Sequence, residues 1–150
     1  MDAALTPTSK AAARGRWAVS AMFLANGFIM GSWAPQIPFM LPRHGISEGV
    51  LGIMILMIGL GAVNAMAWSG WLLTHYGSRR LVSLFGVISS FMLAVVVFAP
   101  NIWLAAPALF MLGTTTGAMD VAMNANAVEV EKRLGRAIMS ASHGFWSLGG

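Results

Sequence analysis

The chain has 150 residues, of which 57% are hydrophobic and only 9% are charged, and its formal net charge is +4. About a quarter of the residues in a soluble domain are charged, so this composition, with a mean hydropathy of +0.73, excludes an ordinary soluble domain and indicates an integral membrane protein. The apolar runs are much longer than the ten-residue strands of a membrane barrel, which predicts an all-α membrane protein. The chain has no cysteine, which excludes disulfides, cysteine-ligated zinc and thiol catalysis.

Residues 1–16 are polar and rich in Ala, Thr and Ser. We interpret them as a disordered, basic cytoplasmic tail. The first apolar run follows directly. It is too long for the core of a signal peptide and no small-residue cleavage site closes it, so we expect it to be retained as a membrane span.

Four apolar runs are long enough to cross a bilayer, which takes about 20 residues. They predict complete transmembrane helices at about 17–40, 49–73, 81–99 and 103–128. The turn dipeptide Pro100-Asn101 separates the third from the fourth. A fifth run, 137–150, is still in progress at Gly150, so we expect an incomplete helix and a longer protein.

Basic residues mark one side of the predicted membrane protein. Only Arg43 lies on the opposite side. By the positive-inside rule, this asymmetry predicts a multi-pass protein with a cytoplasmic N-terminus, and it explains the basic charge without nucleic-acid binding. The basic residues on the cytoplasmic side are Lys10, Arg14, Arg16, Arg79, Arg80, Lys132, Arg133 and Arg136.

Asp120 is a carboxylate within a predicted span, and no charged residue precedes it from residue 81 onward. A charge at the bilayer centre costs at least ~2.5–3.5 kcal/mol, so such residues usually face a cavity or a partner. Gly113, Gly117, Asp120 and Asn124 share one narrow helical stripe. We expect the glycines to permit close helix packing, and Asp120 and Asn124 to form a cavity wall. The alternative is that Asp120 is a permanently protonated structural group.

His143 is a second titratable residue in an apolar setting. If the fourth helix ends at Val128, Asp120 lies ~12 Å from the cytoplasmic end and His143 lies ~9 Å from it. We therefore consider a proton relay between Asp120 and His143, because a desolvated acid can exchange a proton near neutral pH. The alternative for His143 is ordinary packing.

The first span offers a candidate substrate surface. Asn26, Trp33 and Gln36 fall on one helical face, and Pro35 and Pro38 are expected to bend the outer end. These three side chains can stack on and hydrogen-bond a neutral polar solute. Trp33 and Gln36 also fit an interfacial belt at a helix end.

No cofactor or metal is expected. A copper(I) path built on Met119 and Met123 is conceivable, but the 12 methionines are scattered and adaptable packing explains them better. No nucleotide-binding loop is visible, which argues against a self-contained ATP-driven pump. No nucleophile or metal motif accompanies Asp120 and His143, so an enzyme is not expected.

The segment Gly70-Trp-Leu-Leu-Thr-His-Tyr-Gly-Ser-Arg-Arg80 resembles the cytoplasmic loop signature of the major facilitator superfamily. In that family the loop acts as a conformational latch. Thr74 stands where the family has an Asp, and Ser78 displaces the arginine pair by one position. The matching residues are Gly70, Leu72, Gly77, Arg79 and Arg80.

The fourth span sharpens the resemblance. Asp120-Val-Ala-Met-Asn124 and the Pro35-Gln36 pair are similar to the fucose:proton symporter branch of that family, in which the fourth-helix acid serves proton coupling and sugar recognition. This role carries over to Asp120 alone, because residues 30–33 lack the first-helix acid of those symporters. Residues 136–150 resemble the fifth helix of uncharacterised bacterial inner-membrane relatives.

The resemblance implies a major-facilitator-type helical bundle with two six-helix halves, of which residues 17–150 form part of the N-terminal half. The expected function is proton-coupled secondary transport of a small polar, sugar-like solute by alternating access in a bacterial inner membrane. Asp120 and His143 would serve proton coupling, and Asn124 and Asn26 would contact the solute. The alternatives are a proton-coupled exporter of lipophilic cations and a non-transporting scaffold or sensor. The expected partners are the solute, the proton, the lipid bilayer and the other helices of the transporter, with no nucleic acid.

Overall fold

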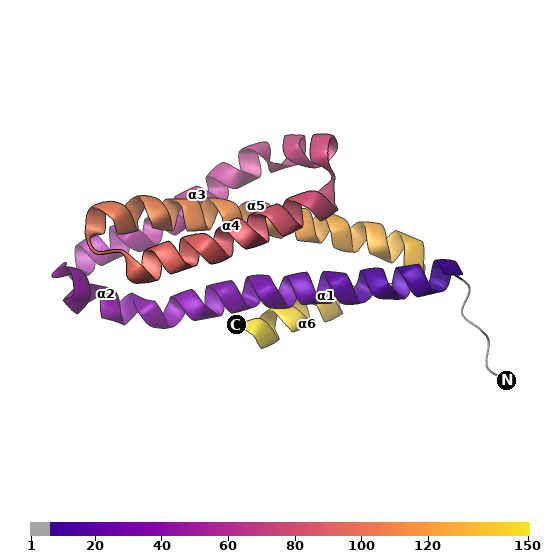
Figure 1. Cartoon of the computed structure of the whole chain (residues 1–150), viewed down its shortest axis with the longest axis horizontal. Coiled ribbons are helices and arrows are strands. Elements are labelled where there is room, and N and C mark those ends of the chain that lie inside the picture. The colour runs from indigo at the N-terminus through magenta and orange to yellow at the C-terminus, as the bar shows by residue number, and fades with distance from the viewer. Residues whose placement is uncertain (1–6) are drawn as a thin grey trace.

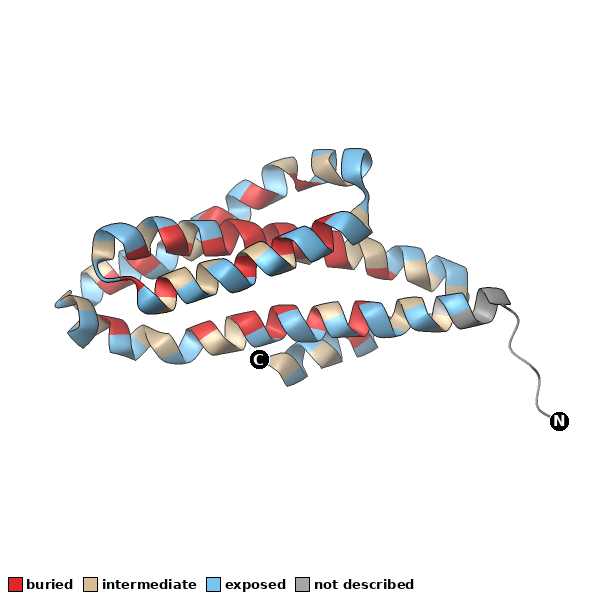
Figure 2. Cartoon of the chain, viewed as in Figure 1, coloured by how far each residue is buried: buried red, intermediate tan, exposed pale blue. Residues whose placement is uncertain are grey.

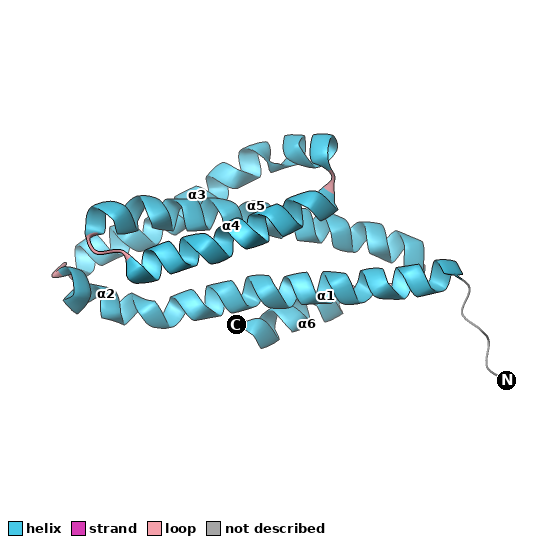
Figure 3. Ribbon diagram, viewed as in Figure 1, coloured by secondary structure: helices cyan, strands magenta, loops and turns pink. Residues whose placement is uncertain are grey.

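The computed structural model describes residues 7–150. For residues 7–10 and Ala12 it describes the backbone and not the side chains. This part of the chain is entirely helical, with short connections and no strand, which confirms the all-α prediction (Figure 3). The elements are α1 (Pro7–Trp33), the 3-10 turn η1 (Ala34–Gln36), α2 (Ile37–His44), α3 (Glu48–Tyr76), α4 (Ser78–Phe98), α5 (Ile102–Leu134) and α6 (Met139–Gly149).

Among the described helices, α3, α4 and α5 are long and apolar enough to cross a membrane. Four complete spans were expected, and the difference lies in α1. It has 27 residues and runs alongside the other long helices, but polar residues such as Ser20 and Asn26 interrupt its apolar stretch (Figure 1). Both of these side chains are buried, so α1 turns its polar residues inward rather than toward lipid.

The first helix differs from its predicted bounds at both ends. It begins at Pro7, so most of the segment interpreted as a disordered tail is helical, and residues 1–6 lie outside the described part. A hydropathy argument misses this extension because the alanines at 11–13 are strong helix formers without being a membrane span. The predicted single helix 17–40 is also wrong: the chain passes into η1 beside Pro35 and continues as the short helix α2, which ends at Gly45 with φ 61°.

The central element is α5. More than half of its apolar stretch is buried, 56%, against 17% for α3 and 28% for α4. Buried residues accordingly concentrate along α5, with α3, α4 and α1 around it (Figure 2). At 33 residues α5 is about 50 Å long, more than the ~30 Å of a hydrocarbon core, and it extends past the predicted end at Val128 to Leu134.

One end of the bundle is basic. Arg14 of α1, Arg79 of α4 and Arg133 of α5 line the same cavity there, because α1 and α4 begin and α5 ends at this level. At the opposite end Arg43 donates a hydrogen bond to the carbonyl oxygen of Val97, 2.8 Å away. We call these the basic end and the Arg43 end.

Two helix pairs cross so closely that only glycine fits. In the α3–α5 crossing, a methyl group on Gly113 would lie 2.0 Å from the Ile58 carbonyl oxygen, and one on Gly61 would lie 2.1 Å from the Phe110 oxygen. Gly117 continues this contact, 2.9 Å from the Ala62 Cα. Such small-residue contacts associate helices in lipid, where burial of apolar side chains gives little driving force.

The α1–α6 crossing repeats this geometry. A methyl group on Gly27 would lie 2.0 Å from the Trp146 carbonyl oxygen, and one on Gly149 would lie 2.2 Å from the Leu24 oxygen. Gly31 corresponds to Gly117 in this crossing, because a methyl group on Gly31 would lie 2.6 Å from the Gly150 Cα. The first helix therefore meets α6 as α5 meets α3, with glycines at matching positions of all four helices.

Candidate functional site

Asp120 is half-buried on α5, one turn beyond Gly117 toward the basic end. Figure 1 shows α3 and α5 separating toward this end, and the last of the close glycine contacts, at Gly117, precedes Asp120 by three residues. The side-chain amide of Asn124 donates to the Asp120 carboxylate at 3.3 Å and to its backbone oxygen at 2.9 Å. The structure thus joins the acid and the amide that the sequence placed on one stripe.

The side chain of His143 on α6 is exposed rather than enclosed in the apolar setting that was expected, and no hydrogen bond joins it to Asp120. Its ring meets the fully buried Phe23 ring edge-on, with centroids 5.0 Å apart. Since α5 ends at Leu134, Asp120 lies ~21 Å from that end rather than the expected ~12 Å. The carboxylate is therefore farther from the end of its helix than the sequence indicated.

The buried threonine hydroxyl groups of α5 differ from Asp120 in their hydrogen bonding. Thr114, Thr115 and Thr116 each donate to a backbone oxygen one turn earlier, at 2.9, 2.9 and 2.7 Å. Their polar groups are satisfied within the helix, so they add no polarity to a cavity. Asp120 is the acid within the apolar part of α5, and its hydrogen-bond partner Asn124 lies on the same helix.

Asn26 is buried, with 3% of its surface exposed, and does not face open space. Its Oδ1 accepts a hydrogen bond of 2.9 Å from the indole N–H of Trp146 on α6. Its Nδ2 is buried and has no hydrogen-bond partner. The residue expected to contact solute therefore connects α1 to α6 beside their glycine crossing.

Trp33 and Gln36 lie toward the Arg43 end, apart from Asp120. Trp33 is 4% exposed and packs in an apolar cluster with Met40 and Leu109, so it is a core residue. Gln36 is half-buried in η1. The predicted solute surface of the first span is therefore not assembled with Asp120 and Asn124.

Most of the segment with the family signature is helical, and the connection between its two helices is a single residue. Gly77 separates α3 from α4 with φ 76°, a left-handed value that suits glycine. Gly70 is exposed inside α3, and Arg79 and Arg80 are exposed in the first turn of α4. Thr74, at the position of the family's acid, donates to the Trp71 backbone oxygen at 2.8 Å.

Several contacts were not anticipated from the sequence. Glu131 near the end of α5 accepts hydrogen bonds from the backbone N–H groups of Ile138 and Met139, at 2.6 and 2.8 Å, and so caps the start of α6. Asn126 donates to Ser78 at 3.1 Å and ties α5 to the start of α4. Their sequence separation, up to 48 residues, leaves no local signal, although an acid shortly before a helix start is a recognisable capping pattern.

Comparison with known proteins agrees with this arrangement. Residues 2–150 match the family described as Major Facilitator Superfamily. The chain is 37% identical over 131 residues to an uncharacterised transporter of Sinorhizobium fredii, covering 87% of this chain and 35% of that protein. It is 41% identical over 128 residues to an uncharacterised MFS-type transporter of Yersinia pestis, covering 85% of this chain and 33% of that protein. It is 30% identical over 132 residues to the membrane protein MosC of Rhizobium meliloti, covering 88% and 32%.

No solved structure matches the chain. The chain spans about a third of the length of the curated relatives it matches. The finer likeness to the fucose:proton symporter branch stays a prediction, because the matched relatives carry no such description. The family match extends over nearly the whole chain, and its spans are those of a membrane protein: the chain belongs to the Major Facilitator Superfamily.

Proposed function

We propose that this chain provides the proton-coupling helices of a secondary transporter for a small polar solute, with Asp120 as the residue that carries the proton. The observation that carries the proposal is an acid on the most buried of the three apolar spans, hydrogen-bonded to Asn124. An ionisable residue at such depth usually serves an ion or substrate pathway.

The proposed cycle uses the partners of Asp120. In the ionised state the Asn124 amide stabilises the carboxylate through a charge-assisted hydrogen bond. Proton uptake removes the negative charge, so this hydrogen bond weakens and Asp120 is freed to change partners. The glycine crossings at Gly113 and Gly117 then offer smooth contacts along which α3 and α5 can slide between inward-open and outward-open states.

For the solute, Asn124 is the best-placed contact. Its amide nitrogen is engaged by Asp120, which leaves its carbonyl oxygen to accept a hydrogen bond from a hydroxyl group of a sugar-like solute. Asn26 is proposed as a positioning residue that holds Trp146, because its own surface is closed off.

We also propose that the protein lies in a bacterial inner membrane with the basic end and the N-terminus in the cytoplasm. The support is that arginines from α1, α4 and α5 meet at one end, whereas Arg43 lies at the other. The loop around Gly77, Arg79 and Arg80 would then change conformation on the cytoplasmic side, without the ionic latch of the family because Thr74 replaces the acid.

The test is pH-driven uptake into proteoliposomes by the complete transporter, with a panel of sugars and lipophilic cations. We expect the wild type to accumulate a sugar-like solute when protons move down their gradient into the vesicles. Asp120→Asn keeps the shape and hydrogen bonding but cannot release a proton, so it should exchange solute without accumulating it. His143→Gln serves as the matched variant, since it removes the second titratable candidate and leaves the acid in place.

Three outcomes would contradict the proposal. Accumulation by Asp120→Asn at the wild-type level would make Asp120 a structural group. Proton-driven movement of lipophilic cations alone would favour the exporter. A folded wild type that moves no compound of the panel, together with a tolerated Asp120→Asn, would favour a scaffold or sensor.

A further inference from the structure

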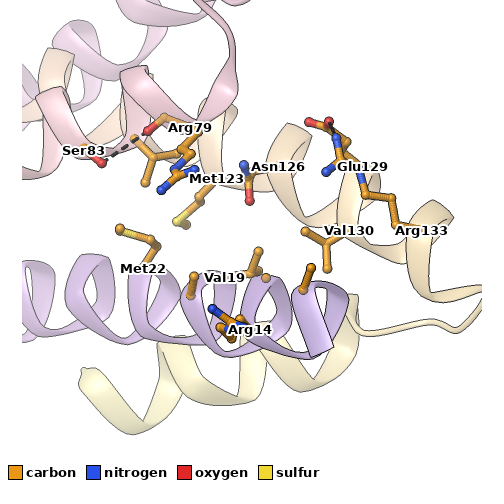
Figure 4. Close-up of a pocket in the computed structure, with 14 residues that line it drawn as sticks. Arg14, Val19, Met22, Arg79, Ser83, Met123, Asn126, Glu129, Val130 and Arg133 are labelled. Atoms are coloured by element: carbon orange, nitrogen blue, oxygen red, sulfur yellow. Dashed lines mark hydrogen bonds and ion pairs between the residues drawn. The ribbon is translucent and has the colours of Figure 1, made fainter. Parts of the chain in front are cut away.

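A second site lies at the basic end, apart from Asp120. A cavity of about 790 Å³ opens between α1, α4 and α5 (Figure 4). Three arginines and one glutamate line it, and the glutamate, Glu129, is already paired with Arg133 one turn along α5. The cavity is therefore positively charged, through Arg14 of α1 and Arg79 of α4.

These two arginines come from different helices and lie around the same space. Figure 4 shows Arg79 extending from α4 in the direction of α1, the helix that carries Arg14. Like charges held across a shared cavity repel each other, and an anion between them adds an attraction to each that offsets this repulsion. Guanidinium groups form their strongest hydrogen bonds with carboxylate and phosphate oxygens, often two at a time.

The deeper part of the cavity is apolar. Its lining includes Val19 and Met22 of α1, Val82 of α4, and Met123 of α5. Met22 lies eight residues after Arg14 on α1, so the apolar lining extends about 12 Å along α1 from this arginine, with Ser83 and Asn126 as polar groups of the wall. A charged rim above an apolar wall fits an amphiphile with an anionic head better than a free anion.

We propose that this cavity binds an anionic phospholipid, with the phosphate between Arg14 and Arg79 and the upper acyl chain against the apolar lining. Basic pockets between transmembrane helices are suited to such headgroups, and anionic lipids are abundant where basic loops gather. The proposal does not depend on which solute is carried, because neither Asp120 nor Asn124 lines the cavity.

The test uses the complete protein in mixed detergent micelles, with phosphatidylglycerol, phosphatidylcholine or inorganic phosphate added in turn. Retained lipid is counted by native mass spectrometry, and stabilisation is read from the thermal unfolding midpoint, which rises with any ligand specific to the folded state. We expect phosphatidylglycerol to bind in preference to phosphatidylcholine. Arg14→Gln and Arg79→Gln should each weaken its binding about fivefold.

Arg80→Gln is the matched control. It removes the same charge from the neighbouring position of α4, and Arg80 does not line the cavity. Its phosphatidylglycerol binding should equal that of the wild type. Three results would overturn the proposal: equal binding of the two lipids, equal losses for the Arg79 and Arg80 variants, or stabilisation by inorganic phosphate as strong as that by phosphatidylglycerol, which would assign the site to a free anion.

Discussion

Replacement of Gly113 by Ala tests whether the close α3–α5 crossing stabilises the fold. The added methyl carbon would lie 2.0 Å from the Ile58 carbonyl oxygen. A comfortable C···O contact is about 3.3–3.6 Å, so the helices must move apart by more than about 1 Å. Because the obstacle is backbone rather than a flexible side chain, we expect a cost near the upper part of the overpacking range, ~2–3 kcal/mol.

Gly59→Ala is the control for this variant. It makes the same chemical change within α3, but a methyl group at Gly59 would meet nothing within 4 Å. Both variants gain the same helix propensity, so the difference between them isolates the crossing. The measurement is the unfolding midpoint of the complete protein in a dodecyl sulfate titration, followed by tryptophan fluorescence. If Gly113→Ala unfolds at the same detergent fraction as Gly59→Ala, the reasoning about the crossing is wrong.

Three further predictions concern the connections between helices. Glu131→Ala should remove the cap of α6 at a cost of ~1–2 kcal/mol and speed amide hydrogen exchange in its first turn, whereas Glu131→Gln should have a smaller effect because it keeps an acceptor. Asn26→Ala should cost ~1–3 kcal/mol, because it leaves the indole N–H of Trp146 without its partner; a double-mutant cycle with Trp146→Phe measures this coupling. Gly77→Ala should cost ~1–2 kcal/mol in thermal stability because of its φ of 76°, whereas Gly70→Ala, inside a helix and facing open space, should not destabilise.

Each of these predictions has a result that counts against it. Unchanged exchange at the start of α6 in Glu131→Ala would mean that water caps the helix equally well. Additive losses in the cycle would show that the two side chains do not interact. Equal melting temperatures for the Gly77 and Gly70 variants would show that the turn relaxes without strain.

The helical class and the turn before α5 followed from the sequence because both rest on local signals. Asn101 ends the loop as expected, and its side chain accepts a hydrogen bond from the Leu104 N–H at 3.0 Å. The ends of α1 and α5 did not follow. Hydropathy marks where lipid contact stops, but both helices continue beyond that point. The first helix extends toward its N-terminus through the alanines, and α5 extends through an amphipathic segment to Leu134, where Gly135 caps it.

The candidate site was predictable where residues share a helix. Asp120 and Asn124 are one turn apart, so their contact follows from helical geometry. Trp33 was assigned to a solute surface because hydrophobic periodicity cannot distinguish a cavity wall from a packed core. The pairing of Asn26 with Trp146 joins residues 120 positions apart, and no local pattern predicts it.

The two glycine crossings also constrain the order in which the bundle can assemble as the chain emerges from the ribosome. Both partners of the α3–α5 crossing are synthesised before α6, so this joint can close first and provide a nucleus in the bilayer. In contrast, α1 must wait for α6 to supply Gly149 and the backbone beside Trp146. The first helix to be made thus gains its close partner only after α3 and α5 have been able to join, and until then the side-chain oxygen of Asn26 lacks the indole N–H that donates to it.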